Sequence, residues 1–177
     1  MYNERMDVSK LVGDQIDLKQ RNSKNTWIPT ASWIGAFCLS YVLRANRENF
    51  LYDIEGFDGE NMQYTEYGEG EFYHWHTDGS LANAFKPGAL RDNWANDFVQ
   101  INSERVRKLS FTLQLSGAEE YGGGEFQFQD DNGHSYFAPK KKGTIIIFDS
   151  RARHRVKKVT RGTRRSIVGW TMGPRWK

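Results

Sequence analysis

The stretch FYHWHTDGS, residues 72–80, places two histidines and an aspartate within five positions of one another. In an extended strand His74 and His76 point to the same face and Trp75 points to the other, while Asp78 follows in the turn TDGS. His76 and Asp78 can therefore converge on one point. An imidazole and a carboxylate that converge in this way are a common pair of metal ligands.

A third ligand must come from a distant part of the chain, where His134 and His154 are the two remaining histidines. His134 follows the turn DDNG, where a solvated residue is expected, whereas His154 follows the apolar run GTIIIFDS, from which a side chain can reach inward. We therefore predict His154. Two imidazoles and one carboxylate leave three positions open on an octahedral ion, as in non-heme Fe(II) oxygenases. Zinc fits the same three ligands and, with a bound water, could support hydrolysis.

A buried cation is expected near this centre. Arg164 begins the run RRSIVGWTM, where it shares one strand face with Ser166, Val168 and Trp170. A guanidinium inside a barrel can hold a carboxylate in a bidentate pair. A keto acid that chelates a metal and carries a second carboxylate would need such a group.

The segments that position these residues predict a mainly β protein with flanking helices. After residue 50, short runs rich in β-branched and aromatic residues alternate with turns such as YGEGE and DDNG. The run KLSFTLQLS (108–116) alternates, with Leu109, Phe111, Leu113 and Leu115 on one face and polar residues on the other. Regular short strands of this kind favour a double-stranded β-helix, or jelly roll.

The first 50 residues are expected to support this core. Residues 1–30 are polar and predict short irregular elements. From 31 to 50 the apolar residues recur at helical spacing and predict an amphipathic helix on a sheet, with its aromatic residues and Cys38 in the core. These residues are Trp33, Ile34, Phe37, Cys38, Tyr41 and Val42. We expect a single domain over 1–177, with N-terminal helical support at 1–50 and the jelly-roll core at 51–177.

The single cysteine excludes an intramolecular disulfide, and the charged start MYNERMDVSK lacks the apolar segment of a secretory signal. The longest apolar run stops at Arg44, short of the roughly 20 residues that a membrane-spanning helix needs. These features predict a cytoplasmic protein without a membrane span.

The charge is polarised along the chain. The net charge is only +3, yet residues 140–177 carry 13 lysines and arginines against one acid, Asp149. Such a basic end can bind nucleic acid or a membrane surface, or attract a small anion, and it can also be a solvated face. The long segment 79–107 has weak periodicity and is a candidate lid or binding loop.

Three ordered motifs resemble one family. YGEGEFYHWHTDG (67–79) fits the pattern Y-x-x-G-x-x-Y-x-x-H-x-D, LSFTLQLSGAEEYGGGEFQF (109–128) is similar to a central strand with a glycine-rich turn, and HRVKKVTRGTRRSIVGW (154–170) is similar to a distal-histidine segment. From about residue 60 to 172 the chain thus resembles the 2-oxoglutarate and Fe(II)-dependent dioxygenases of the prolyl 4-hydroxylase-like branch, including the bacterial PKHD-type hydroxylases.

The resemblance implies roles for individual residues. His76, Asp78 and His154 would bind Fe(II) as the catalytic centre, and Arg164 would pair with the distal carboxylate of 2-oxoglutarate. Tyr67 would donate a hydrogen bond to that same carboxylate. An arginine at position 164, where many prolyl hydroxylases carry lysine, is similar to the PKHD-type branch.

Four further residues are candidates for substrate binding. Tyr73 and Trp170 occupy positions that face the substrate in prolyl hydroxylases, although packing in the strand core is a competing interpretation for both. Arg91 and Trp94, in the candidate lid, are the other two.

The implied activity is hydroxylation of a C–H bond, foremost of a prolyl residue in a peptide or protein, with dioxygen as oxidant and ascorbate as an optional reductant. One alternative is a 2-oxoglutarate-dependent nucleic-acid demethylase that uses KKK (140–142) and RARHRVKK (151–158), but we find no base-reading motif and expect no nucleic-acid partner. Another is a cupin-like module or zinc protein that uses the pair His74 and His76. The last alternative is a β-sandwich protein without catalytic activity that binds a partner.

Overall fold

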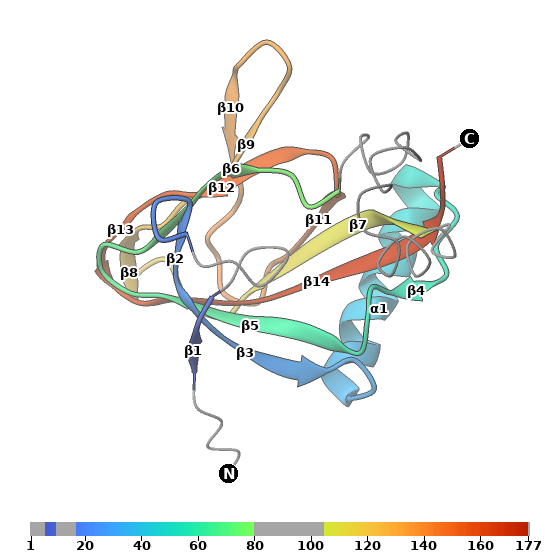
Figure 1. Ribbon diagram of the computed structural model, residues 1–177, viewed down its shortest axis with the longest axis horizontal. Coiled ribbons are helices and arrows are strands. Elements are labelled where there is room, and N and C mark those ends of the chain that lie inside the picture. Colours follow the sequence, from blue (N-terminus) through green and yellow to red (C-terminus); the bar gives the residue numbers. More distant parts are fainter. Residues whose placement is uncertain (1–5, 10–16, 80–104, 177) are drawn as a thin grey trace, which may run out of the picture.

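The computed structural model describes residues 6–9, 17–79 and 105–176 of the chain. Two antiparallel sheets face each other, and one helix packs along the outside of the larger sheet (Figure 1). This arrangement confirms the predicted jelly roll.

The larger sheet, called the major sheet below, has the order β1-β3-β5-β14-β7-β11, with β4 paired to β14. Its strands are β1 (Asp7–Val8), β3 (Lys24–Pro29), β4 (Gly56–Phe57), β5 (Asn61–Tyr67), β7 (Arg105–Gln114), β11 (Ile145–Asp149) and β14 (Arg164–Pro174). The minor sheet has the order β10-β9-β12-β6-β2. Its strands are β2 (Arg21–Asn22), β6 (Phe72–His76), β9 (Phe126–Gln129), β10 (Ser135–Phe137) and β12 (Arg153–Val156), while β8 (Tyr121–Gly123) and β13 (Val159–Gly162) pair separately.

The alternation predicted for residues 108–116 is present in β7. Leu109, Phe111 and Leu113 lie in the hydrophobic core beneath the helix. Thr112 and Gln114 are buried on the opposite face, where Thr112 lines the cavity between the sheets. β7 therefore separates an apolar core from a polar interior, because successive side chains of a strand point to opposite faces.

The helix α1 (Trp33–Ala45) begins at Ser32, whose side chain accepts a hydrogen bond from the backbone N–H of Gly35. Cys38 and Val42 are fully buried in the core, but the prediction that the aromatic residues of this helix are buried is wrong. These residues are exposed, Trp33 by 78%, Phe37 by 43% and Tyr41 by 43%. The six apolar residues form two neighbouring rows of i, i+4 spacing, and one row occupies the contact with the sheet.

A π-helical turn, η1 (Asn46–Phe50), extends α1. Among the described residues, no helix combines the length and the apolar character that crossing a membrane requires.

Residues 24–29 were expected to be irregular, but they form β3, which pairs with β5 along its whole length. Asn25 is buried in this strand and Trp27 is about half exposed. Asn25 and Trp27 lie on the same face of the strand and both line the cavity, while Ile28 of the other face packs against the hydrophobic core. A polar and an aromatic residue on one face break the alternation by which a half-buried strand is recognised. The segment therefore carries no clear strand signal.

The close approach of β14 to the chain before β4 gives a testable prediction. A Cβ atom added at Gly173 would lie 1.8 Å from the backbone oxygen of Asp53. Gly173→Ala is therefore expected to lower the free energy of unfolding by about 1–3 kcal/mol, as overpacking does. Urea denaturation followed by circular dichroism measures this change. Gly68→Ala is the matched control, since its nearest neighbour would be 3.7 Å away; equal midpoints for the two variants would contradict the prediction.

Candidate metal centre

The structure brings His76, Asp78 and His154 together. β6 and β12 are antiparallel neighbours in the minor sheet, and His154 pairs with His76 in their register. Asp78 follows β6 directly, and its backbone N–H donates a hydrogen bond to the carbonyl of Ser150 at 2.9 Å. Two strands and one anchored turn thus position the three side chains, as the sequence predicted.

The candidate ligand atoms of these residues all lie within 4.8 Å of one another. The Asp78 carboxylate is 3.7 Å from Nε2 of His76 and 3.6 Å from Nε2 of His154. These distances exceed those of hydrogen bonds, and Asp78 Oδ2 is buried without a hydrogen-bond partner. A buried carboxylate oxygen without a partner is costly unless a ligand satisfies it.

The two imidazoles present their Nε2 atoms to the same point. Nδ1 of His76 lies 2.7 Å from the carbonyl of His74, and Nδ1 of His154 lies 2.9 Å from the carbonyl of Ala152. Since a carbonyl can only accept, each Nδ1 carries the proton and donates it there. Each Nε2 lone pair then remains available to a metal, which is the arrangement that orients histidine ligands in metal sites.

Electrostatics favour a neutral His76 and an ionised Asp78. Burial, together with the charge of His154, lowers the pKa of His76 to about 3. Burial raises the pKa of Asp78, but the electrostatic interactions of its carboxylate with His154 and His76 outweigh that effect. The pKa of Asp78 therefore lies below its usual value. At neutral pH the cluster therefore contains an anionic carboxylate beside a neutral imidazole. Two imidazoles, one carboxylate and a buried unpartnered oxygen fit a divalent iron with open positions.

Arg164 lines the same cavity as the cluster and is 1% exposed. Its two terminal nitrogens donate to Ser166 Oγ and Gln114 Oε1, both at 3.1 Å, while its Nε is buried without a partner. Burial lowers the pKa of this guanidinium. Within 6–9, 17–79 and 105–176, no carboxylate forms an ion pair with Arg164. A buried charge that lacks a counterion in the protein is a site for an anionic ligand.

The cavity that joins these two groups has a volume of about 470 Å³, within the usual range for small-molecule sites. Tyr67, Tyr73 and Trp170, which were predicted to contact the co-substrate or the substrate, line this cavity. The Tyr67 ring lies 5.7 Å from the guanidinium carbon of Arg164. The Tyr73 ring stacks on His76 with the ring centroids 3.6 Å apart.

The placement of His74 differs from the prediction. His74 is exposed and does not line the cavity, so it does not share a face with His76. The register between β6 and β12 shifts between His154 and Val156, and this irregularity turns both Tyr73 and His76 inward. The structure thus gives no support to a metal pair of His74 and His76. His134 is exposed in its hairpin turn, as expected.

The candidate substrate residues Arg91 and Trp94 lie outside the described residues, as does most of the candidate lid. The last part of that segment is not a loop, because β7 begins at Arg105. Arg107 therefore belongs to the strand, lies in the cavity wall and places its guanidinium 4.3 Å from the Trp170 ring.

Sequence reasoning did not single out Gln114, Ser166 or Arg107, all of which line or border the cavity. For Gln114 a signal was available, since it lies on the polar face of a strand whose other face is apolar. For Ser166 the signal was its place on the same strand face as Arg164, two residues away. Arg107 gave no such signal, because it precedes the alternating run.

Comparison with known proteins identifies a family. The profile described as the 2OG-Fe(II) oxygenase superfamily matches residues 62–172. A PKHD-type hydroxylase of Picosynechococcus is 34% identical over 110 residues, which is 62% of this chain and 40% of the relative. The chain spans between 33% and 60% of the length of the curated relatives that it matches.

Solved structures agree on the fold. A prolyl-4-hydroxylase of Pseudomonas putida superposes with a TM-score of 0.65 at 20% identity, covering 94% of this chain and 76% of that one. A prolyl hydroxylase of Trichoplax adhaerens, solved with a peptide of hypoxia inducible factor, gives a TM-score of 0.68 at 16% identity, covering 95% and 70%. With the profile extending from β5 into β14, across all three candidate ligands, the chain belongs to the 2OG-Fe(II) oxygenase superfamily.

Proposed function

We propose that this protein is an Fe(II)- and 2-oxoglutarate-dependent dioxygenase that hydroxylates a prolyl residue of a peptide or protein. The observation that carries the proposal is the shared cavity, which is lined both by the His-Asp-His cluster and by the buried Arg164. A dicarboxylic keto acid can bind a metal at the first group and place its second carboxylate on the second. A ligand that binds in this way needs the metal ion and the positive charge of Arg164 in the same cavity.

In this proposal His76, Asp78 and His154 hold the iron. The carbonyls that accept from the two histidine rings fix their orientation, and the backbone bonds from Asp78 and Gly79 to Ser150 fix the turn. The bound centre would supply the oxidation, in which dioxygen and 2-oxoglutarate yield succinate, carbon dioxide and one hydroxyl group on the substrate carbon. The side chains themselves bind, orient and exclude water.

Arg164 would bind the distal carboxylate of 2-oxoglutarate. Gln114 and Ser166 accept hydrogen bonds from its terminal nitrogens and orient the guanidinium in the cavity. The Nε, which has no hydrogen-bond partner among the described residues, would donate to the ligand. Tyr67 would add a hydroxyl donor beside it, since its ring lies next to the guanidinium.

Substrate binding would occur where Tyr73 and Trp170 line the cavity near the cluster. A prolyl substrate is suggested by the solved prolyl hydroxylases that share the fold, one of which carries a peptide. The curated relatives, named PKHD-type hydroxylases, support hydroxylation without naming the residue. Arg91 and Trp94 remain candidate contacts in the part of the chain that the structure does not describe.

Anaerobic titration of the protein with Fe(II) and 2-oxoglutarate tests the centre. The chelate of iron and keto acid has a weak visible charge-transfer band, which we expect in the wild type at one iron per chain. His76→Ala should remove the band, and Arg164→Ala should require far more 2-oxoglutarate to produce it. A wild type that binds iron but never shows the band would contradict the proposal.

The prolyl substrate needs a separate test. Incubation with proline-containing peptides, Fe(II), 2-oxoglutarate and ascorbate should give a peptide whose mass rises by one oxygen and should release succinate in equal amount. The same peptides with proline replaced by alanine are the control. If the band forms but the alanine peptides are oxidised as much as the proline peptides are, the dioxygenase assignment stands and the prolyl substrate does not.

A further inference from the structure

The outer face of the minor sheet carries aromatic and cationic side chains on neighbouring strands, linked by the buried Gln127, which accepts a hydrogen bond from Nε of Arg155 at 2.7 Å. Arg155 pairs with Gln127 across β12 and β9, and Gln127 pairs with Phe137 across β9 and β10. The Arg155 guanidinium lies 4.4 Å from the ring of Trp75 in β6. The row Trp75, Arg155, Gln127 and Phe137 therefore crosses four strands, and we call it the outer row.

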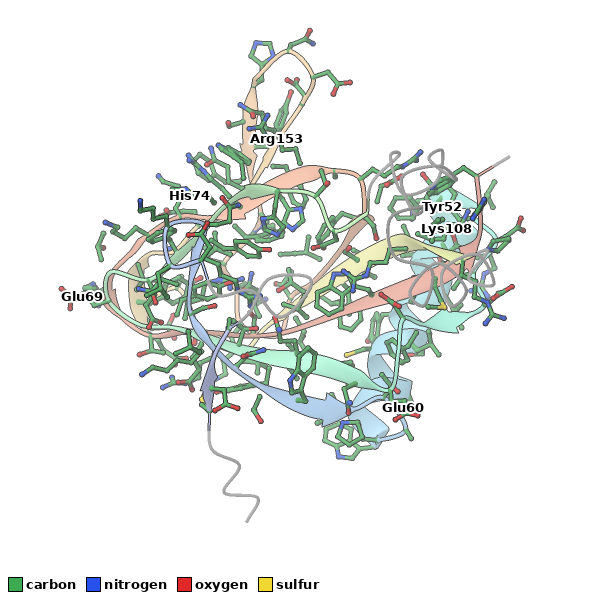
Figure 2. All side chains as sticks on the ribbon, in the orientation of Figure 1. Tyr52, Glu60, Glu69, His74, Lys108 and Arg153 are labelled. Atoms are coloured by element: carbon green, nitrogen blue, oxygen red, sulfur yellow. The ribbon has the colours of Figure 1, made fainter. Side chains whose placement is uncertain are left out.

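More cations surround the outer row. Arg153 is exposed and lies 5.7 Å from the Trp75 ring, on the side of the sheet on which Figure 2 also labels His74. Lys158 is exposed and lies 5.9 Å from the ring of Phe72. Phe137 remains 60% exposed at the base of a hairpin that extends beyond the sheet (Figure 1). Rings and positive charges thus share one open surface.

These cations have few counterions in the protein. Lys157 contacts Glu125 at 3.6 Å, but among the described residues no carboxylate forms an ion pair with Arg153, Arg155 or Lys158. Three positive charges without a carboxylate partner on one face attract a polyanion. Arg153 and Arg155 are two residues apart in a strand and so lie on the same side at a spacing of about 7 Å.

We propose that the outer face of the minor sheet binds single-stranded nucleic acid. Unpaired cations would track the phosphates, while Trp75 and Phe137 would stack on bases, whose flat faces are accessible only in a single strand. An acidic peptide would neutralise the charges but would offer nothing for the rings to stack on. The sequence alone offered only the basic run RARHRVKK (151–158) as a reason to consider this partner, because it does not show that these rings and cations gather on one face.

This surface is separate from the candidate metal centre. His154 lies between Arg153 and Arg155 in β12 but points into the cavity, since neighbouring residues of a strand face opposite sides. Binding on the outer face therefore does not depend on the proposed oxygenase activity. The protein could hold a nucleic acid while the cavity acts on another molecule.

Fluorescence anisotropy with a labelled 12-nucleotide oligothymidylate tests the proposal on the full chain. We expect a Kd in the micromolar range at 50 mM NaCl. If Arg153, Arg155 and Lys158 each displace one counterion from the single strand, the affinity should fall about 20-fold between 50 and 200 mM NaCl. Arg153→Gln/Arg155→Gln should weaken binding at least about 10-fold and flatten the salt dependence.

Matched variants separate the proposal from general attraction. Arg44→Gln/Arg47→Gln removes the same charge from α1 and η1 and should leave the Kd within about 2-fold. Trp75→Leu and Phe137→Ser keep the charge and should each weaken binding about 5- to 10-fold through lost stacking. Phe137 is exposed, so its replacement should not affect folding.

Several results would overturn the proposal. These are an absence of binding at 50 mM NaCl, equal losses in the two double variants, or polyglutamate that competes as well as oligothymidylate while Trp75→Leu has no effect. The last result would identify the face as a site for acidic peptides. His76→Ala should bind oligothymidylate as the wild type does, so that failure of the metal centre and failure of this surface can be distinguished.

Discussion

Asp78→Ala is expected to abolish stoichiometric Fe(II) binding and to reduce turnover by more than about 100-fold. Asp78 supplies the only carboxylate of the cluster, and without it two imidazoles remain to hold a divalent ion. Loss of a residue that only hydrogen-bonds to a metal ligand already costs about 10- to 100-fold in metal affinity or activity. Loss of a ligand itself should cost more. Iron retained after anaerobic loading and desalting, measured with a colorimetric chelator, gives the stoichiometry.

His74→Ala is the matched control for this prediction. His74 lies two residues before His76 and offers the same chemistry, but its side chain is exposed and outside the cavity. Its replacement should leave the iron content at that of the wild type. If His74→Ala lost iron and Asp78→Ala retained it, the metal site would have to be reassigned to the pair of histidines in β6.

Arg164→Gln is expected to raise the KM for 2-oxoglutarate by about 10- to 150-fold with a much smaller change in kcat. A hydrogen bond to a charged group contributes about 1.5–3 kcal/mol, and this one would bind a part of the co-substrate that does not react. The distal carboxylate would also lose the positive charge that neutralises it inside the protein. Succinate formation as a function of 2-oxoglutarate concentration gives both constants.

Arg165→Gln provides the control at the neighbouring position. Arg165 forms a partly exposed ion pair with Glu66 on the other side of β14, so its replacement should leave the KM unchanged. Arg164→Lys should recover part of the lost affinity, because it keeps the charge without the fork of donors. Thermal unfolding of each variant excludes a general loss of structure. A fall in kcat at constant KM would contradict the assignment of Arg164.

The strands of the barrel and the three clustered residues could be predicted from the sequence because each depends on a local regularity. The alternation of β7 and the shared face of Arg164 and Trp170 follow from the two-residue period of a strand. His154 could be preferred to His134 because the run before it is apolar and the turn before His134 is polar. The structure places both histidines as that difference predicts.

Other features depend on contacts that no local pattern records. The register shift between β6 and β12 separates His74 from His76, and it becomes visible only when the two strands are paired. In α1 the rows containing Cys38 and Trp33 are equally apolar, and the sheet buries only one of them. The outer row likewise combines residues from four strands, so the sequence separates its members by tens of positions.

The pairing of β7 with β14 has a consequence for how this protein can change in evolution. In each strand successive residues alternate between the cavity wall and the hydrophobic core. Thr112, for example, lines the cavity and Phe111 lies in the core. Substitution at one position alters one face alone. Insertion or deletion of a single residue would exchange the two faces along the rest of the strand, putting apolar groups into the cavity and polar groups into the core. Relatives of this chain should therefore differ in length within the loops, while their strands diversify by substitution.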